Sequence, residues 1–178
     1  MVKLQRRDFL AGAGAMVLSG PASAGVDADF AAVGLARPPV AIKAPTLDVP
    51  DLNGTLHRVE DYLGKVVLVS FWATWCPPCR KEMPSLARLN RAMPSDSFAV
   101  LAVNVGDKDE RISDFLAQID HEGLPVLLDR NSTLPSQWFI RGLPVSYVLD
   151  REGKVAFGAI GGREWDAPGI QDALRALI

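Results

Sequence analysis

Cysteine is scarce in this sequence, with only Cys76 and Cys79 among 178 residues. A structural disulfide works mainly by closing a long loop of the unfolded chain, and a bridge between these neighbours closes almost none. A structural zinc site takes four ligands, and both histidines, His57 and His121, lie far from the cysteines in sequence. Covalent haem attachment needs a histidine after the second cysteine, where this chain has Arg80. The cysteines are therefore available for chemistry of their own, and we expect no metal and no other cofactor.

The chain also lacks a strong excess of either charge and a long apolar run near its start. Its formal net charge is −2 and no cluster of lysine and arginine occurs in its body, so nucleic acid is not an expected partner. The N-terminal apolar stretch runs from about Phe9 to Leu18, which is shorter than the ~20 residues that span a bilayer as a helix. The length and the 48% hydrophobic content are typical of one globular domain with a small extension.

Residues 1–24 have the layout of a signal peptide. Positive residues at the start precede the apolar stretch, and Ala22-Ser23-Ala24 is typical of a cleavage site. The run from Arg6 to Leu10, RRDFL, is similar to the twin-arginine signal that directs folded proteins out of the bacterial cytoplasm. An ordinary secretory signal and an uncleaved membrane tether are the alternatives. We therefore expect a periplasmic protein.

The rest of the chain divides into two parts. Residues 25–40 are rich in Ala, Gly and Pro without periodic patterning, and we interpret them as a flexible lead-in. Residues 41–178 carry the alternating patterns of a folded domain. His57 and His121 are expected to be solvated surface residues of that domain.

Apolar patterning predicts strands that alternate with helices. The near-continuous apolar run Lys65–Trp72 is typical of a strand buried on both faces. A helical pattern follows and ends at Pro94, and Asp107 is expected to cap the next helix with Glu110 as its capping-box partner. The other expected elements are a hairpin of Thr46–Val49 with Thr55–His57, a strand at Ser97–Val105, a helix through Ile112–Ile119, a strand at Leu124–Leu128, a hairpin of Val145–Leu149 with Lys154–Ile160, and a C-terminal helix that includes Ile170, Leu174 and Leu177. This order predicts an α/β protein with three layers around a mixed sheet.

The cysteine pair stands where the first buried strand passes into a helix. At the helix start, the thiolate of Cys76 would be stabilised by free backbone N–H groups and by the positive end of the helix dipole. Pro77 and Pro78 suit the first turn, whose N–H groups have no partner inside the helix. Cys79 comes about one turn later and would face inward. We therefore predict that Cys76 is the accessible nucleophile and Cys79 the resolving thiol; two reduced core cysteines are the alternative.

Three segments together resemble the TlpA/ResA-type thioredoxin-like proteins of bacterial envelopes. They are Phe71–Pro84 with the sequence FWATWCPPCRKEMP, Gly142–Asp150 with GLPVSYVLD, and Val103–Gly106 with VNVG. The resemblance covers roughly residues 42–178. It implies a thioredoxin fold, three-layer α/β/α with a central mixed sheet, an N-terminal hairpin and a strand–helix insertion within about Asp107–Trp138.

The resemblance also implies roles for residues around the cysteines. Cys76 and Cys79 would form a redox-active disulfide. Pro144 would have a cis peptide bond and lie opposite the cysteines, and Leu143 would offer backbone hydrogen bonds to a substrate. Trp75 and Pro77 flank the nucleophile and are expected to contact the substrate as well.

Glu82 is a further candidate for the catalytic machinery. It follows Cys79 by three residues, so both lie on the same helical face. A buried carboxyl there would have a raised pKa and can exchange a proton with the resolving thiol. Ordinary thioredoxins place an aspartate two residues before Trp72, where this chain has Ser70, which makes Glu82 the better proton relay. A surface glutamate near a helix start is the alternative.

The function that we expect from the resemblance is reduction of disulfides in exported client proteins. Its clients would be apocytochrome c or a copper-site protein with a cysteine pair, and a membrane electron donor would recharge it. A disulfide-introducing oxidase and a copper(I)-binding chaperone that uses the same two thiolates are the alternatives. A peroxidase is a weaker one.

Overall fold

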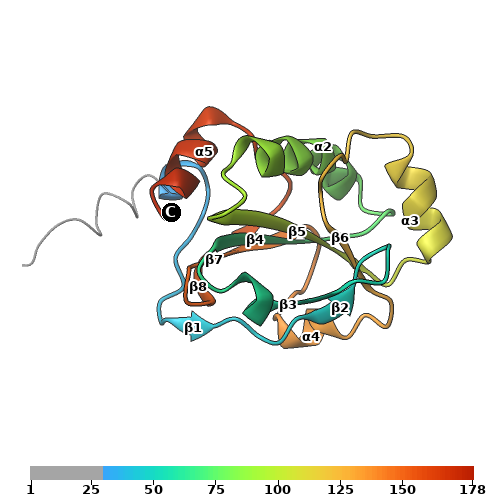
Figure 1. Cartoon of the computed structure of the whole chain (residues 1–178), viewed down its shortest axis with the longest axis horizontal. Coiled ribbons are helices and arrows are strands. Elements are labelled where there is room, and N and C mark those ends of the chain that lie inside the picture. The colour runs from blue at the N-terminus through green and yellow to red at the C-terminus, as the bar shows by residue number, and fades with distance from the viewer. Residues whose placement is uncertain (1–29) are drawn as a thin grey trace, which may run out of the picture.

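The centre of the fold is a six-stranded sheet with the strand order β1-β8-β7-β4-β5-β6 (Figure 1). The computed structural model describes residues 30–178, so the predicted signal peptide and the first part of the lead-in lie outside the described residues. Parallel pairing joins β4 to β5 and β5 to β6, whereas β4–β7, β7–β8 and β8–β1 are antiparallel. The strands are β1 (Ile42–Lys43), β4 (Val66–Trp72), β5 (Phe98–Val105), β6 (Val126–Asp129), β7 (Val145–Leu149) and β8 (Lys154–Ile160).

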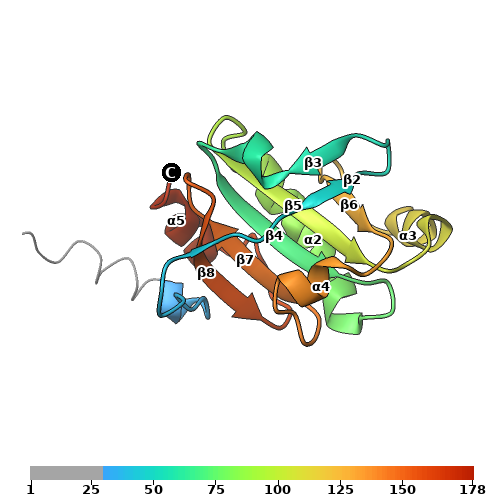
Figure 2. The same cartoon turned by 90° about the horizontal axis from the view of Figure 1, so that it is seen from below.

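Helices cover one face of the sheet, and a hairpin with two short helices covers the other (Figures 1 and 2). The first face carries α2 (Pro77–Ala92) and α5 (Pro168–Arg175), while α3 (Asp109–Leu116) lies beside the β6 edge and adds to the same core. The second face carries the hairpin of β2 (Asp48–Pro50) and β3 (Leu56–Arg58), the 3-10 helix η1 (Val59–Tyr62) and the one-turn helix α4 (Leu134–Gln137). Within residues 30–178, no helix is both long and apolar enough to cross a membrane. The predicted thioredoxin-like fold with a mixed sheet and an N-terminal hairpin is confirmed.

Strand β4 shows why its sequence is apolar at nearly every position. All seven of its residues are buried, and successive side chains point to opposite faces. Leu68 and Trp72 belong to the core beneath α2, whereas Val69 and Phe71 belong to the core beneath the hairpin. Ser70 shares the parity of Leu68 and Trp72, so this strand presents its one polar side chain to α2.

The described part of the predicted flexible lead-in is instead packed on the domain. Phe30 is 0% exposed, and its ring stacks on Phe157 with 3.7 Å between the centroids. Leu35 is also buried, and Ala36 forms an isolated bridge with Gly158 of β8. The prediction for residues 25–40 is therefore wrong from Phe30 to Ala36, because two large apolar side chains help to cover the sheet there.

His57 is likewise not the solvated residue that we expected. Its side chain is only 15% exposed. Nδ1 contacts the hydroxyl of Tyr62, and Nε2 lies 3.4 Å from Oδ2 of Asp51. These partners come from the turn of the β2–β3 hairpin and from η1, so the ring ties the two together. His121 is also partly buried, with Nδ1 3.3 Å from the carbonyl of Ile119.

Candidate active site

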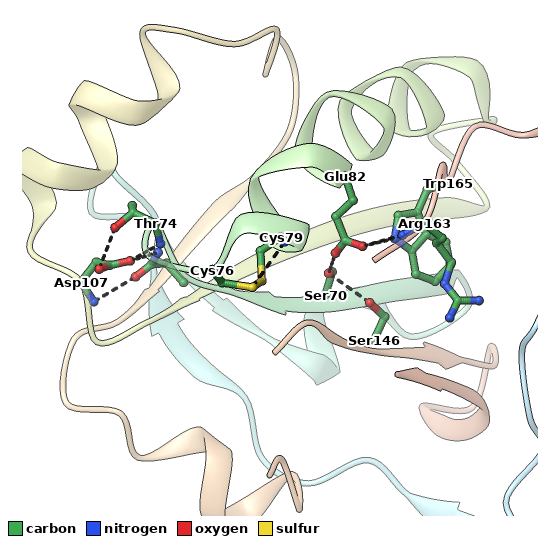
Figure 3. Close-up of a disulfide and its surroundings, with 10 residues drawn as sticks. Ser70, Thr74, Cys76, Cys79, Glu82, Asp107, Ser146, Arg163 and Trp165 are labelled. Atoms are coloured by element: carbon green, nitrogen blue, oxygen red, sulfur yellow. Dashed lines mark hydrogen bonds between the residues drawn. A yellow bond between two sulfur atoms is a disulfide. The ribbon is translucent and has the colours of Figure 1, made fainter. Parts of the chain in front are cut away.

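Cys76 and Cys79 form a disulfide at the junction of β4 and α2 (Figure 3). Cys76 is the N-cap of α2, and Pro77 is the first helical residue. The backbone N–H of Cys79 donates a 3.3 Å hydrogen bond to Sγ of Cys76. The predicted strand–cysteine–helix order is therefore present, and it aims a free helix N–H group at the first sulfur, where a thiolate would benefit from it.

The two cysteines differ less in exposure than we expected. Cys76 is 3% exposed and Cys79 is 0% exposed in this disulfide form. Trp75, the residue before the pair, is 64% exposed, and Pro77 is exposed as well. In this disulfide form the fold covers both sulfurs and leaves only a small part of Cys76 at the surface. The roles of Cys76 as nucleophile and Cys79 as resolving thiol remain predictions.

The Leu143–Pro144 peptide bond is cis, as the resemblance implies. Val145 pairs with Phe71, close to the end of β4 that leads into the cysteines. Pro144 therefore lies at the same end of the sheet as the disulfide. Leu143 is partly buried against both cores. The substrate contacts expected for Trp75, Pro77 and Leu143 remain predictions.

Residues around this cis bond also line a wide hollow. Its volume is about 730 Å³, and it lies between residues 34–38, the loop 139–142 and strands β7 and β8. Gly142 and Val145 on its wall flank the Leu143–Pro144 pair. The surface beside the cis-proline is thus concave and mainly apolar.

Glu82 points from α2 toward β4 and is 1% exposed (Figure 3). The hydroxyl of Ser70 donates a 3.0 Å hydrogen bond to Oε1. The backbone N–H of Arg163 and the indole Nε1–H of Trp165 donate to Oε2 at 3.2 and 3.3 Å. Behind Ser70, the hydroxyl of Ser146 donates to Ser70 Oγ at 3.0 Å, which extends the buried polar chain into β7.

Burial raises the pKa of Glu82 from 4.5 to about 7. The hydrogen bonds from Ser70, Arg163 and Trp165, together with the charge of Arg163, oppose this rise in pKa but do not cancel it. Burial also lowers the pKa of Arg163, and the charge of Glu82 partly offsets that decrease. Glu82 additionally lines a surface hollow of about 190 Å³ with Pro78 and Gly162. A carboxyl that is half ionised near pH 7 and borders a hollow can exchange protons with solvent.

The partners of Glu82 include residues that the sequence analysis missed. Arg163 and Trp165 follow β8 and are 81 and 83 positions from Glu82 in the chain. Ser85 holds this segment in place, because its hydroxyl accepts a 3.0 Å hydrogen bond from the backbone N–H of Trp165. The one signal in the sequence was Trp165 itself, since a buried indole N–H needs an acceptor.

On the other side of the disulfide, Asp107 fixes the loop that precedes Cys76 (Figure 3). Its carboxylate accepts hydrogen bonds from the backbone N–H and the hydroxyl of Thr74 at 2.6 and 2.9 Å, and from the amide of Asn104 at 2.9 Å. The predicted helix cap is therefore wrong: the N-cap of α3 is Lys108, with no side-chain cap bond. Asp107 is committed to a loop 33 residues upstream and is not available to cap the helix.

The disulfide thus lies between two buried polar networks, one centred on Asp107 and one on Glu82. Across residues 30–178, no group of three or more His, Cys, Asp and Glu side chains is placed to hold a metal ion. The reactive groups of the site are the two sulfurs of Cys76 and Cys79, and the titratable carboxyl of Glu82 lies behind them.

Fold and site together define a class: thioredoxin-like proteins with a redox-active CxxC disulfide. Within that class the chain belongs to the AhpC/TSA family, whose sequence profile matches residues 40–157. The resemblance noted in the sequence is confirmed by ResA of Geobacillus thermodenitrificans strain NG80-2, which is named a thiol-disulfide oxidoreductase. The two chains are 36% identical over 118 residues, which cover 65% of this chain and 66% of that relative, just under two thirds of its length.

Solved structures give the same result for the fold. A Chlorobium tepidum protein described as a thiol:disulfide interchange protein, DsbE, superimposes with a TM-score of 0.70 at 32% identity, covering 77% of this chain and 96% of that one. The exposed lipoprotein thioredoxin Etrx1 of Streptococcus pneumoniae strain TIGR4 superimposes with a TM-score of 0.65 at 27% identity, covering 74% and 99% of the two chains.

Proposed function

We propose that this protein is a thiol–disulfide oxidoreductase that reduces disulfides of client proteins outside the cytoplasm. The observation that carries the proposal is the Cys76–Cys79 disulfide at the start of α2 with the buried acid Glu82 three residues further on. The similarity to proteins named thiol-disulfide oxidoreductase and thiol:disulfide interchange protein supports the same activity.

In the first step, the thiolate of Cys76 attacks one sulfur of a client disulfide. A mixed disulfide forms between Cys76 and the client, and the other client sulfur leaves as a thiolate that takes up a proton. The position of Cys76 as helix N-cap favours its thiolate, since the N–H of Cys79 already points at Sγ.

In the second step, Cys79 resolves the mixed disulfide. Glu82 as a carboxylate accepts the proton of the Cys79 thiol, and the new thiolate attacks Sγ of Cys76. The Cys76–Cys79 disulfide forms, and the client leaves with both of its cysteines reduced. A pKa of about 7 lets Glu82 accept this proton and then release it near neutral pH.

The finer assignments follow the resemblance. The clients would be apocytochrome c or a copper-site protein, and a dithiol donor at the membrane would return two electrons to the Cys76–Cys79 disulfide. The signal-like residues 1–24 support export to the periplasm, and one similar structure is that of a lipoprotein described as exposed. The direction of transfer is testable as a reduction potential, about −270 mV for thioredoxin against about −120 mV for a strong oxidant of the DsbA type.

A trapping experiment tests the proposal. Reduced Cys79→Ser protein should accumulate a mixed disulfide between Cys76 and a disulfide-bonded peptide, whereas Cys76→Ser should form none and the unaltered protein should turn over. Equilibration with glutathione then gives the potential, which we expect near the thioredoxin end. A potential near that of DsbA would favour the oxidase, and retention of one copper(I) per reduced chain without disulfide exchange would favour the copper chaperone.

A further inference from the structure

A small hollow lies on the Asp107 side of the disulfide, away from Glu82. Its volume is about 270 Å³, and it is formed between the start of α2 and the helix α3. Trp75, the exposed neighbour of Cys76, lies on its wall, and the largely buried ring of Phe115 lies at its base. The other lining residues are Thr74, Arg80, Arg111, Asp114 and Gln118. A client segment that reaches Cys76 passes close to this hollow, because Thr74 and Trp75 directly precede the nucleophile.

Two arginines of the hollow have unused hydrogen-bonding capacity. The Arg80 guanidinium lies 4.8 Å from the centroid of the Phe115 ring. Stacking orients this group without consuming its N–H donors. Neither Arg80 nor Arg111 makes a side-chain hydrogen bond or an ion pair with any residue in the range 30–178.

Three other surface arginines are engaged with acids. The guanidinium groups of Arg88, Arg91 and Arg130 each make two or more hydrogen bonds to carboxylates of nearby segments. Asp114 is the one acid among the residues that line the hollow, and Asp107 lies behind its wall, where its carboxylate is committed to Thr74 and Asn104. The hollow therefore carries two cations against one anion, in a chain whose formal net charge is −2.

We infer that this hollow binds an acidic side chain of the client polypeptide, next to the client cysteine that reacts with Cys76. The inference rests on the proposed function and adds a client chemistry to it. A carboxylate can accept paired hydrogen bonds from a planar guanidinium, and two arginines at one concave site favour an aspartate or glutamate over a neutral residue. Trp75, which is 64% exposed on the wall of the hollow, adds apolar surface beside this contact.

The experiment compares three disulfide-bonded peptides that differ only at the residues beside the cysteine: glutamate, glutamine or lysine. The reduced protein is mixed with each, and the second-order rate constant is measured at low and at physiological ionic strength. We expect the glutamate peptide to react about three- to tenfold faster than the glutamine peptide at low salt, since each exposed ion pair contributes a small free energy that salt screens. The lysine peptide should be slower than both.

Variants locate the effect. The ratio of glutamate to glutamine rates should fall to about one in Arg80→Gln/Arg111→Gln, and it should rise in Asp114→Asn because a competing anion is removed. Lys154→Gln, on β8, removes one positive charge away from the hollow and should preserve the ratio. Because the glutamate and glutamine rate constants are compared within one variant, a change in the general reactivity of Cys76 affects both and leaves their ratio unchanged.

The possible outcomes separate the two proposals. Equal rates for the glutamate and glutamine peptides with the unaltered protein would overturn the acidic-client inference and leave the reductase intact. A ratio that survives in the double variant would overturn it as well, because the selectivity would reside elsewhere. Failure to reduce any of the three peptides would instead overturn the proposed function.

Discussion

The hydroxyl of Ser70 donates a 3.0 Å hydrogen bond to Oε1 of Glu82, and both side chains are buried. Ser70 stands on β4 at the position where the resemblance places the aspartate of ordinary thioredoxins. The position of Ser70 in the apolar strand directs its side chain toward α2, and α2 carries the acid, Glu82. The titratable group behind the disulfide is thus provided by the helix, while the strand provides a donor that stabilises its ionised form.

The raised pKa of Glu82 predicts that the oxidised protein becomes less stable as pH rises. A carboxyl with a higher pKa in the folded state binds more protons when folded, so stability is lost between the two pKa values. With a shift from 4.5 to about 7, the loss should occur across that interval and approach roughly 3 kcal/mol. Glu82→Gln should remove this loss of stability. The free energy of unfolding of the variant should therefore exceed that of the unaltered protein by an amount that grows toward pH 7. Denaturant unfolding of both oxidised forms measures it. Glu152→Gln, an exposed control, should show the same pH dependence of stability as the unaltered protein. If Glu82→Gln shows that same pH dependence, the pKa of Glu82 is not raised.

The same substitution should change the titration of the reduced thiols. An ionised Glu82 opposes formation of a thiolate at Cys79, so its replacement by a neutral amide should lower the pKa of that thiol. Resolution of a mixed disulfide should also lose its dependence on a group that titrates near pH 7, because glutamine accepts no proton. Thiolate absorbance against pH, together with the pH profile of peptide reduction, tests both effects. Superimposable curves for the two proteins would assign the proton relay to another group.

Asp107 should position the loop that leads into Cys76. Asp107→Asn leaves one oxygen where the carboxylate accepts hydrogen bonds from Thr74 and Asn104, so at least one buried donor loses its partner. We expect a loss of about 1–3 kcal/mol in stability and a lower rate of attack by Cys76, with altered fluorescence of Trp75. The control Asp109→Asn only breaks an exposed ion pair with Arg130 and should cost about 1 kcal/mol or less. Identical reactivity of Cys76 in both variants would mean that Asp107 has only a structural role.

Local patterns in the sequence were sufficient for the strand, the cysteine pair and the helix. The run Val66–Trp72 is apolar because both faces of β4 are buried, and the prolines after Cys76 mark the helix start. The cis bond at Pro144 came from the resemblance and not from local physics. These features depend on neighbours in the chain or on a recognisable motif.

Features created by distant segments could not be predicted in this way. Arg163 and Trp165 reach Glu82 across more than 80 positions, and no local periodicity signals such a contact. The capping rule for Asp107 failed because a buried partner, Thr74, outcompetes the helix terminus for its carboxylate. Phe30 lies in a stretch rich in small residues, and its burial depends on stacking against the ring of Phe157, in a strand that follows much later in the chain.

Gly162 should be intolerant of a side chain because it packs directly on the cysteine turn. A Cβ at this position would lie 3.0 Å from the carbonyl oxygen and 3.2 Å from Cβ of Pro78. Gly162→Ala should therefore push Pro78 outward, cost about 1–3 kcal/mol in stability and alter peptide reduction. Gly142→Ala is the control, since its Cβ would meet nothing within 4 Å. Thermal unfolding of both oxidised variants gives the comparison. Equal stabilities would show that the turn at Pro78 moves to accommodate the added Cβ without a loss of stability.

Phe30 should contribute to stability as a core residue, although it precedes the domain predicted from the sequence. Its side chain is 0% exposed and stacks on Phe157, and the backbone that follows is held by Arg163, whose guanidinium donates to the carbonyls of Val33 and Gly34 at 3.0 Å. Phe30→Ala should lower the free energy of unfolding by about 3 kcal/mol, since it leaves a cavity over β8. Phe139→Ala is the matched control, because that ring is 77% exposed and its truncation should cost about 0.5 kcal/mol or less. Denaturant unfolding of the oxidised proteins measures the loss of stability in both variants. Equal losses would mean that residues 30–36 do not stabilise the domain and belong to a flexible lead-in. Because Arg163 also donates its backbone N–H to Glu82, Phe30→Ala should in addition shift the pH dependence of stability, whereas Phe139→Ala should not.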